Sequence, residues 1–203
     1  MLAVIAIAIG IQLALPDKFV LRPRTAAPSL EAALCLVLAI RNPGPLQVDR
    51  PILRRLSLLL VGILAITNAV STGLLVHAIV TAEQVSAAKI LASGAGIWLT
   101  NVIAFALWYW EFDRGGPVAR AAGGRGRTDF LFPQMSDPRL DPHWSATFID
   151  YLYVSFTNST AFSPTDTMPL SRWAKLLMLV QALISLVTVG LVAARAIGLL
   201  PAG

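Results

Sequence analysis

The residues of this chain with the clearest potential for chemistry lie in one polar stretch, Phe148 to Pro169, which reads FIDYLYVSFTNSTAFSPTDTMP. Its second half is rich in hydroxyl groups, among them those of Thr160, Ser163 and Thr165, and it contains one carboxylate, that of Asp166. Rings of carboxylates at a pore mouth favour cations. The stretch is too polar to cross a bilayer, and a long apolar segment follows it. Irregular backbone survives at membrane depth only where it is buried in protein or lines water, so the stretch indicates a re-entrant loop.

The first half of the stretch has a recognisable pattern. The pattern F-x-D-x-L-Y-x-S is formed by Phe148, Asp150, Leu152, Tyr153 and Ser155, and the turn that follows is framed by Thr160, Asp166 and Pro169. In these positions the stretch resembles the pore loop of the tetrameric potassium-channel-like superfamily of cation channels. In that superfamily a pore helix of this type precedes the filter T-T-V-G-Y-G-D, and a proline often follows. The resemblance covers about a quarter of the chain, from residue 148 to about residue 199.

The interior of the filter departs from the superfamily pattern. Thr, Val, Gly, Tyr and Gly are replaced here by Ala161, Phe162, Ser163, Pro164 and Thr165. Glycine adopts the alternating backbone angles of a carbonyl ladder without cost, whereas proline fixes φ and lacks an N–H. The resemblance therefore implies a homotetrameric pore in which side-chain hydroxyls and the closing carboxylate line an atypical filter. Such a pore would pass partly hydrated potassium or sodium and select weakly between them.

A second interpretation gives the same stretch no conducting role. Phe162 and Pro164 would then plug the loop, and Asp166 would cap the turn before the final helix. The chain would be a non-conducting, channel-like membrane scaffold or accessory subunit. An oligomeric state other than four would favour this interpretation.

The composition is that of an integral membrane protein, which we expect in a bacterial-type plasma membrane. The chain has 203 residues, of which 56% are apolar and 13% charged. Soluble domains are nearer half apolar and a quarter charged. The net charge of +5 belongs mainly to arginines beside apolar segments. Such arginines commonly report orientation in the membrane, so we expect the lipid bilayer and other copies of the chain as partners, and no nucleic acid.

Five apolar segments predict an all-α fold with about five transmembrane helices, and these segments span residues 2–15, 28–40, 56–80, 87–110 and 171–200. The first is shorter than the roughly 20 residues that a span needs, so the first two segments either cross as a hairpin or lie partly buried. We divide the chain into N-terminal membrane helices, residues 1–80, and a channel-like pore domain, residues 87–203. That domain comprises an outer helix at 87–110, an aqueous loop at 111–145, a pore helix and filter-like loop at 147–169, and an inner helix at 171–200.

Polar residues inside the apolar segments are the remaining candidates. Gln181, Ser185 and Thr188 fall broadly on one helical face, where they either line a pore cavity or hydrogen-bond to neighbouring helices. Glu31 is the only acidic residue in an early apolar segment, where such a residue is by default a candidate proton or ion ligand. Because it lies near the end of its segment, we expect it instead to snorkel to the interface. Small residues around Gly94 predict close helix packing.

The sequence offers little support for an enzyme. It contains no HExxH, no GxSxG, no paired intramembrane carboxylates and no Ser-His-Asp set, so we predict no catalytic residues, metal site or cofactor. Glu111 and Asp113 follow an aromatic cluster and indicate that the chain enters water there. Orientation stays open, because channel geometry puts the loop outside and with it Arg41, Arg50, Arg54 and Arg55, against the positive-inside tendency.

Overall fold

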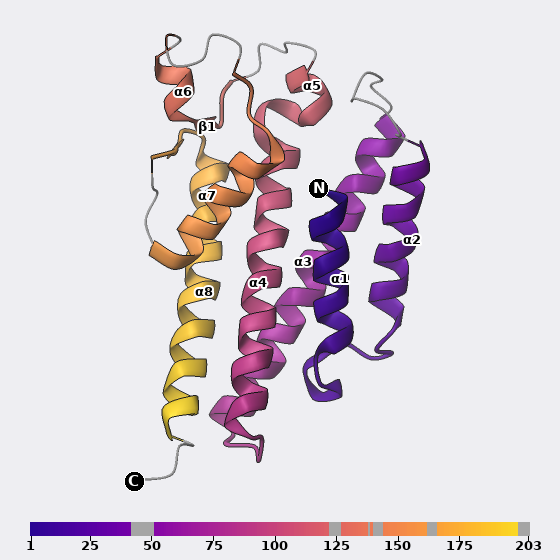
Figure 1. Cartoon of the computed structure of the whole chain (residues 1–203), viewed down its shortest axis with the longest axis vertical. Coiled ribbons are helices and arrows are strands. Elements are labelled where there is room, and N and C mark those ends of the chain that lie inside the picture. The colour runs from indigo at the N-terminus through magenta and orange to yellow at the C-terminus, as the bar shows by residue number, and fades with distance from the viewer. Residues whose placement is uncertain (42–50, 122–126, 138, 140–143, 162–165, 199–203) are drawn as a thin grey trace.

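A computed structural model describes the chain except for residues 42–50, 122–126, 138, 140–143, 162–165 and 199–203. The described part is almost entirely helical (Figure 1). Three helices are long and apolar enough to cross a membrane, namely α3 (Pro51–Val80), α4 (Ala87–Phe112) and α8 (Arg172–Gly198). The prediction of an all-helical protein with long apolar helices is thereby confirmed, and these features are those of an integral membrane protein.

Two shorter helices precede the three long ones. They are α1 (Leu2–Ala14) and α2 (Ala26–Arg41), joined by a turn that contains the short helix η1 (Asp17–Phe19). The 13 residues of α1 extend about 20 Å, which is less than the roughly 30 Å thickness of a bilayer core. That α1 and α2 cross the membrane therefore stays a prediction.

Short elements connect α4 to α8, within the region predicted as an aqueous loop and pore loop. In chain order they are η2 (Asp113–Gly115), α5 (Pro117–Ala121), β1 (Phe130–Leu131), α6 (Pro133–Ser136), α7 (Phe148–Ala161) and β2 (Met168–Pro169). β1 and β2 pair antiparallel, with Leu131 opposite Met168. Part of the predicted aqueous loop, residues 122–126, 138 and 140–143, lies outside the described residues.

α4 is the central helix of the bundle. It contacts α1 and α3 on one side and α7 and α8 on the other, and 67% of its apolar stretch is buried, against 28% for α8. The small residues of α4 permit this packing. A Cβ on Gly94 would come within 2.6 Å of Val192 in α8, and one on Gly96 within 2.9 Å of Ile11 in α1. The prediction of close packing at these small residues is confirmed.

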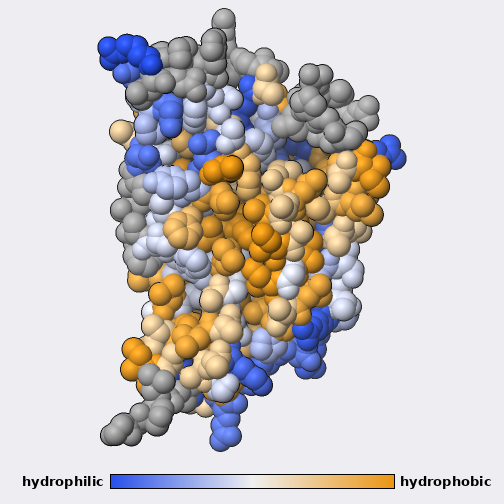
Figure 2. All heavy atoms as spheres, in the orientation of Figure 1, coloured by the Kyte–Doolittle hydropathy of each residue, from blue (hydrophilic) through white to orange (hydrophobic). Residues whose placement is uncertain are grey.

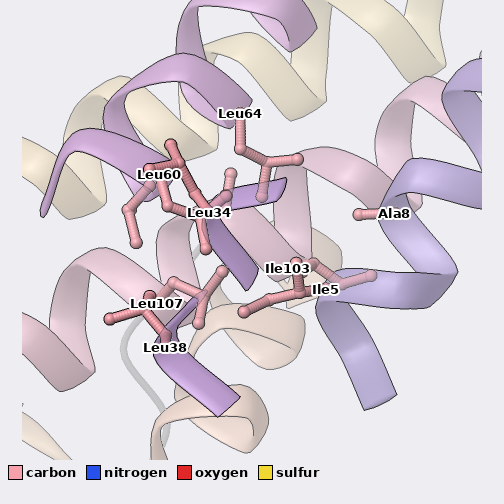
Figure 3. Close-up of a cluster of buried hydrophobic side chains, with 10 residues drawn as sticks. Ile5, Ala8, Leu34, Leu38, Leu60, Leu64, Ile103 and Leu107 are labelled. Atoms are coloured by element: carbon pink, nitrogen blue, oxygen red, sulfur yellow. The ribbon is translucent and has the colours of Figure 1, made fainter. Parts of the chain in front are cut away.

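Two groups of buried side chains hold the two sides of α4. The first joins α1, α2, α3 and α4 and includes Ile5, Ala8, Leu34, Leu38, Leu60, Leu64, Ile103 and Leu107 (Figure 3). The second is rich in aromatic rings and joins α4, β1, α7 and α8; it includes Tyr109, Phe130, Tyr151 and Met178. Apolar burial therefore surrounds α4 on both sides.

The surface is apolar between two hydrophilic ends (Figure 2). α8 contributes strongly to this apolar surface, because every exposed residue from Leu176 to Gly198 is apolar or glycine. An exposed apolar face of this length suits contact with lipid or with another helix.

Candidate functional site

α7 is a short helix that enters the bundle from one end. It begins near the end of α4 and the start of α8, runs obliquely along both, and ends partway along α8 (Figure 1). Its 14 residues extend about 21 Å, too short for a bilayer crossing. The start of the helix is fixed locally, since the Asp150 carboxylate accepts hydrogen bonds from the N–H and the hydroxyl of Thr147, both at 2.7 Å. The bond from the Thr147 N–H is one of the two hydrogen bonds of a capping box.

Gln181 of α8 is the centre of a buried polar cluster that binds three helices together. Its Oε1 accepts hydrogen bonds from Tyr109 Oη of α4 at 2.6 Å and from Asn158 Nδ2 of α7 at 2.9 Å. Its Nε2 donates to Ser155 Oγ at 2.6 Å and to Ser159 Oγ at 2.8 Å, both in α7. Every polar atom of this wholly buried amide is thus paired, which stabilises one arrangement of the helices.

Further hydrogen bonds attach α7 and α8 to their neighbours. Ser155 Oγ donates to the Val102 carbonyl of α4 at 2.6 Å, and Asn158 Nδ2 donates to the Met178 carbonyl of α8 at 2.9 Å. One turn deeper along α8, Ser185 Oγ accepts a hydrogen bond from Asn101 Nδ2 of α4 at 3.3 Å. These contacts place α7 firmly between the two long helices.

The three polar residues that we predicted on one face of α8 do share a face. Gln181, Ser185 and Thr188 are all buried and turned toward α4 and α7 of the same chain. Gln181 and Ser185 make hydrogen bonds between helices there. Thr188 lines a largely apolar pocket of about 480 Å³ between α4, α8 and the end of α7, together with Trp98 and Thr160.

The predicted filter is described only at its two ends. Thr160 is exposed on the last turn of α7, where its hydroxyl donates to the Phe156 carbonyl at 3.0 Å, and Ala161 ends the helix. Phe162, Ser163, Pro164 and Thr165 lie outside the described residues. Asp166 is exposed, and two residues later Met168 pairs with β1. By Met168 the chain has therefore returned to the end of the bundle from which α7 started.

An acidic and aromatic cluster at that end was missed in the sequence. We expected Asp113 to stand in water, but it is wholly buried, and Glu111 is 3% exposed. Asp113 accepts hydrogen bonds from Tyr151 Oη at 2.5 Å, from the Asp129 N–H at 3.1 Å and from Arg114 Nε at 3.3 Å. Polar donors from three segments surround it, which explains why a carboxylate is tolerated there. The many aromatic residues next to Glu111 and Asp113 in the sequence were the available indication that these two acidic side chains are buried.

Asp129 and Arg120 complete this cluster. Asp129 accepts a hydrogen bond from Trp173 Nε1 at the start of α8, at 2.8 Å, and its carbonyl accepts one from the Leu170 N–H. The Arg120 guanidinium lies 4.3 Å from the centre of the Trp110 ring and donates to the carbonyls of Trp110 and Asp113. The cluster therefore ties the end of α4 to the starts of α7 and α8.

The expectation for Glu31 is wrong. Instead of reaching the interface, its side chain is completely buried between α1 and α3. Periodicity along α2 alone does not indicate this, because the residues that receive the carboxyl group, Gln12 and Thr67, belong to other helices.

Comparison of the chain with protein-family models, with curated proteins and with solved structures finds no match.

Proposed function

We propose that this chain is a subunit of a homotetrameric pore-loop cation channel. In this proposal α4 is the outer helix, α7 the pore helix, residues 160–166 the filter and α8 the inner helix. The observation that carries it is the placement of α7. This helix is too short to cross a bilayer, is held between two long apolar helices by buried hydrogen bonds, and is followed by a return of the chain to the end where it began.

The electrostatics of α7 support the same proposal. The C-terminal end of a helix carries a partial negative charge, and here it lies at Thr160 and Ala161. If four such ends converge on an axis, they favour a cation between them. The exposed Asp166 carboxylate adds negative charge near the mouth. The filter would be formed by Thr160, Ala161, Phe162, Ser163, Pro164, Thr165 and Asp166, and would pass potassium or sodium with weak selectivity.

The exposed side of α8 supports assembly with further copies. Only 28% of its apolar stretch is buried in the single chain, and its exposed positions include Leu179, Leu183 and Leu186. An inner helix of a tetramer needs such a free face for its neighbours and for the cavity wall.

The same helix also supports the alternative, a non-conducting channel-like scaffold. Gln181 and Ser185 are paired within their own subunit, so the face of α8 available to an axis is apolar. An apolar constriction of a pore can lose its water, and ions then cannot pass through it. In this alternative the chains form a tight oligomer, of four or of another number of copies, whose axis stays dry.

Subunit counting and ion flux together separate the two proposals. The purified protein should be tetrameric and, in liposomes, should release loaded K⁺ or Na⁺. Asp166→Asn should reduce the flux several-fold, whereas Glu83→Gln should not, because Glu83 is an exposed acid paired with Lys18 at the opposite end. A tetramer without flux at any voltage or pH would favour the scaffold. Any other subunit number would contradict the channel.

A further inference from the structure

Three helices meet at one carboxyl group on the side of the bundle away from α7. Glu31 lies in the second turn of α2 and has no exposed surface. Gln12 Nε2 of α1 donates to its two oxygens, at 3.0 Å and 3.3 Å. Thr67 Oγ1 of α3 lies 3.3 Å from Oε1. The group is therefore a structural junction of α1, α2 and α3.

The charges around this carboxyl group are few. α1 carries no titratable side chain, and within the described residues no Lys, Arg or His forms an ion pair with Glu31. On α3, Arg54, Arg55 and His77 are ten or more positions from Thr67, about 15 Å or more along the axis. The Arg24 guanidinium at the α1–α2 turn bonds to the Asp17 carboxylate and to the Leu13 carbonyl. A buried carboxyl group without a counter-charge is more stable in its neutral form.

The hydrogen bonds of Thr67 support the neutral form. A hydroxyl group has one proton to donate, and the Thr67 hydroxyl lies 2.6 Å from the Ile63 carbonyl, which can only accept. The Thr67 proton is therefore committed to the shorter bond, and the 3.3 Å contact with Glu31 Oε1 becomes a full hydrogen bond only if a protonated carboxyl group donates to the Thr67 oxygen. Oε2 remains free to accept from Gln12 at 3.0 Å.

A small cavity lies beside the junction. Its lining includes the polar residues Gln12, Thr67, Ser71 and Arg24 together with apolar residues of the α1–α2 turn and the start of α2, and its volume of about 10 Å³ is close to the least that holds one water molecule. Gln12 is 4% exposed, and its Oε1 has no hydrogen-bond partner among the described residues. A water in the cavity would satisfy this oxygen. The cavity reaches Arg24, whose side chain is 40% exposed at the α1–α2 turn, so it leads from the junction toward water.

We propose that Glu31 is a buried proton-binding site, which holds one proton in the packed bundle and exchanges it with water at the α1–α2 turn through the cavity beside Gln12 and Thr67. On release, the O–H bond at Oε1 breaks and the Thr67 oxygen accepts the proton while its own proton passes to the cavity water; that water gives a proton to bulk water, and a carboxylate remains. That carboxylate still accepts a hydrogen bond from the Gln12 N–H. Once the Thr67 hydroxyl again donates to the Ile63 carbonyl, its contact with Glu31 has lost the shared proton, so two oxygen atoms that can only accept then face each other. Release therefore weakens the junction of α1, α2 and α3. This proposal does not depend on the proposed pore.

Infrared difference spectra of the full-length protein in lipid test the proposal. The wild-type spectrum minus that of Glu31→Gln should contain the carbonyl band of a protonated carboxylic acid at neutral pH, replaced by carboxylate bands as the pH rises. Glu111→Gln is the matched control, because Glu111 is a buried carboxyl group bonded to Ser57, and its band should be separate. Thr67→Val should shift the Glu31 band without removing it, because it removes the acceptor. Only carboxylate bands for Glu31 at neutral pH would overturn the proposal.

Thermal unfolding gives a second measurement. Glutamine imitates the neutral acid, so Glu31→Gln should lack the fall in melting temperature that the wild type shows as the pH rises from the ordinary pKa of a glutamate toward the raised pKa of the buried group. Equal pH dependence of the two proteins would contradict the proposal. If Na⁺ at constant neutral pH removes the acid band, the site binds a metal cation and the proton assignment is wrong.

Discussion

The two buried polar clusters of this bundle differ in how completely their atoms are paired. Around Gln181, a neutral amide receives two donors and gives its protons to hydroxyl groups of α7, so the cluster has no charge to change. Around Glu31, the carboxyl group has one strong donor, the Gln12 Nε2 amide. The Oε1 oxygen of the same Gln12 amide has no hydrogen-bond partner within the described part of the chain. The first cluster is suited to fixing α7 in place. The second is suited to responding to pH.

The largest effect is expected from breaking the Gln181 cluster. Gln181→Leu leaves Tyr109, Asn158 and two serines of α7 without their partner, and buried polar groups that lose a partner cost about 1–3 kcal/mol each. Hydrogen bonds in membrane helices are worth less on average, so we expect a total loss of about 3 kcal/mol in the free energy of unfolding. Denaturation in mixed micelles measures it.

The matched control for that substitution is Ile66→Ala, at an exposed apolar position of α3 and away from the face of α8 that the proposed assembly uses. It should change stability by no more than about 0.5 kcal/mol. Equal losses in the two variants would show that the cluster contributes nothing beyond its apolar contacts.

The next effect concerns the contact between α4 and α8 that the Gln181 cluster requires. Gly94→Ala puts a methyl group 2.6 Å from Val192 Cγ2, and overpacking of this kind costs about 1–3 kcal/mol. Gly62→Ala is the control, because nothing lies within 4 Å of the added Cβ, and alanine is the better helix former. We expect Gly94→Ala to lower the melting temperature and Gly62→Ala to leave it unchanged or raise it. The reverse order would contradict the described packing.

A smaller effect is expected at the Glu31 junction at neutral pH. Glu31→Gln keeps the shape of the side chain and a neutral group, so the free energy of unfolding should change by less than about 1 kcal/mol. Glu31→Ala removes the hydrogen bonds and leaves a cavity, and we expect it to cost at least about 2 kcal/mol. The difference between the two variants, measured in the same micelles, isolates the contribution of the polar junction. If both variants are equally destabilised, the junction requires the charged form, contrary to our proposal.

The smallest effect on stability is expected at the predicted filter. In a Cys35→Ser background, Asp166→Cys should fold as well as the parent and react with a membrane-impermeant thiol reagent, because Asp166 is exposed. Ser185→Cys, at a wholly buried position of α8, should stay unlabelled. Adding the reagent to one side of sealed vesicles also reports which side carries the loop. Protection of Asp166→Cys from both sides would contradict a water-filled mouth.

The sequence predicted the helices well because their signals are local. Long apolar runs set α3, α4 and α8 to within a few residues, except that α3 begins at Pro51, five positions before the apolar run at residue 56. There the helix continues through Arg54 and Arg55, which are polar but good helix formers. The polar stretch from Phe148 was recognised as unusual from its composition.

The partners of the polar residues could not be predicted in the same way. Gln181, Ser185 and Thr188 were placed on one face by their spacing, but spacing does not say which helix that face meets. Asp113 and Glu111 were expected in water because charged residues usually lie there. They are buried because Tyr151 and Ser57 come from segments far away in the chain to pair with them.

By itself, the sequence determined that this is a helical membrane protein, where its long helices lie and which stretch interrupts them, since hydrophobic length and local propensity are properties of contiguous residues. Only the tertiary structure decided that α7 is held between α4 and α8 and that Glu31 is buried at a junction of three helices. The free energy of a buried polar group depends on the donors, acceptors and water around it, and here those come from residues 19 to 72 positions away.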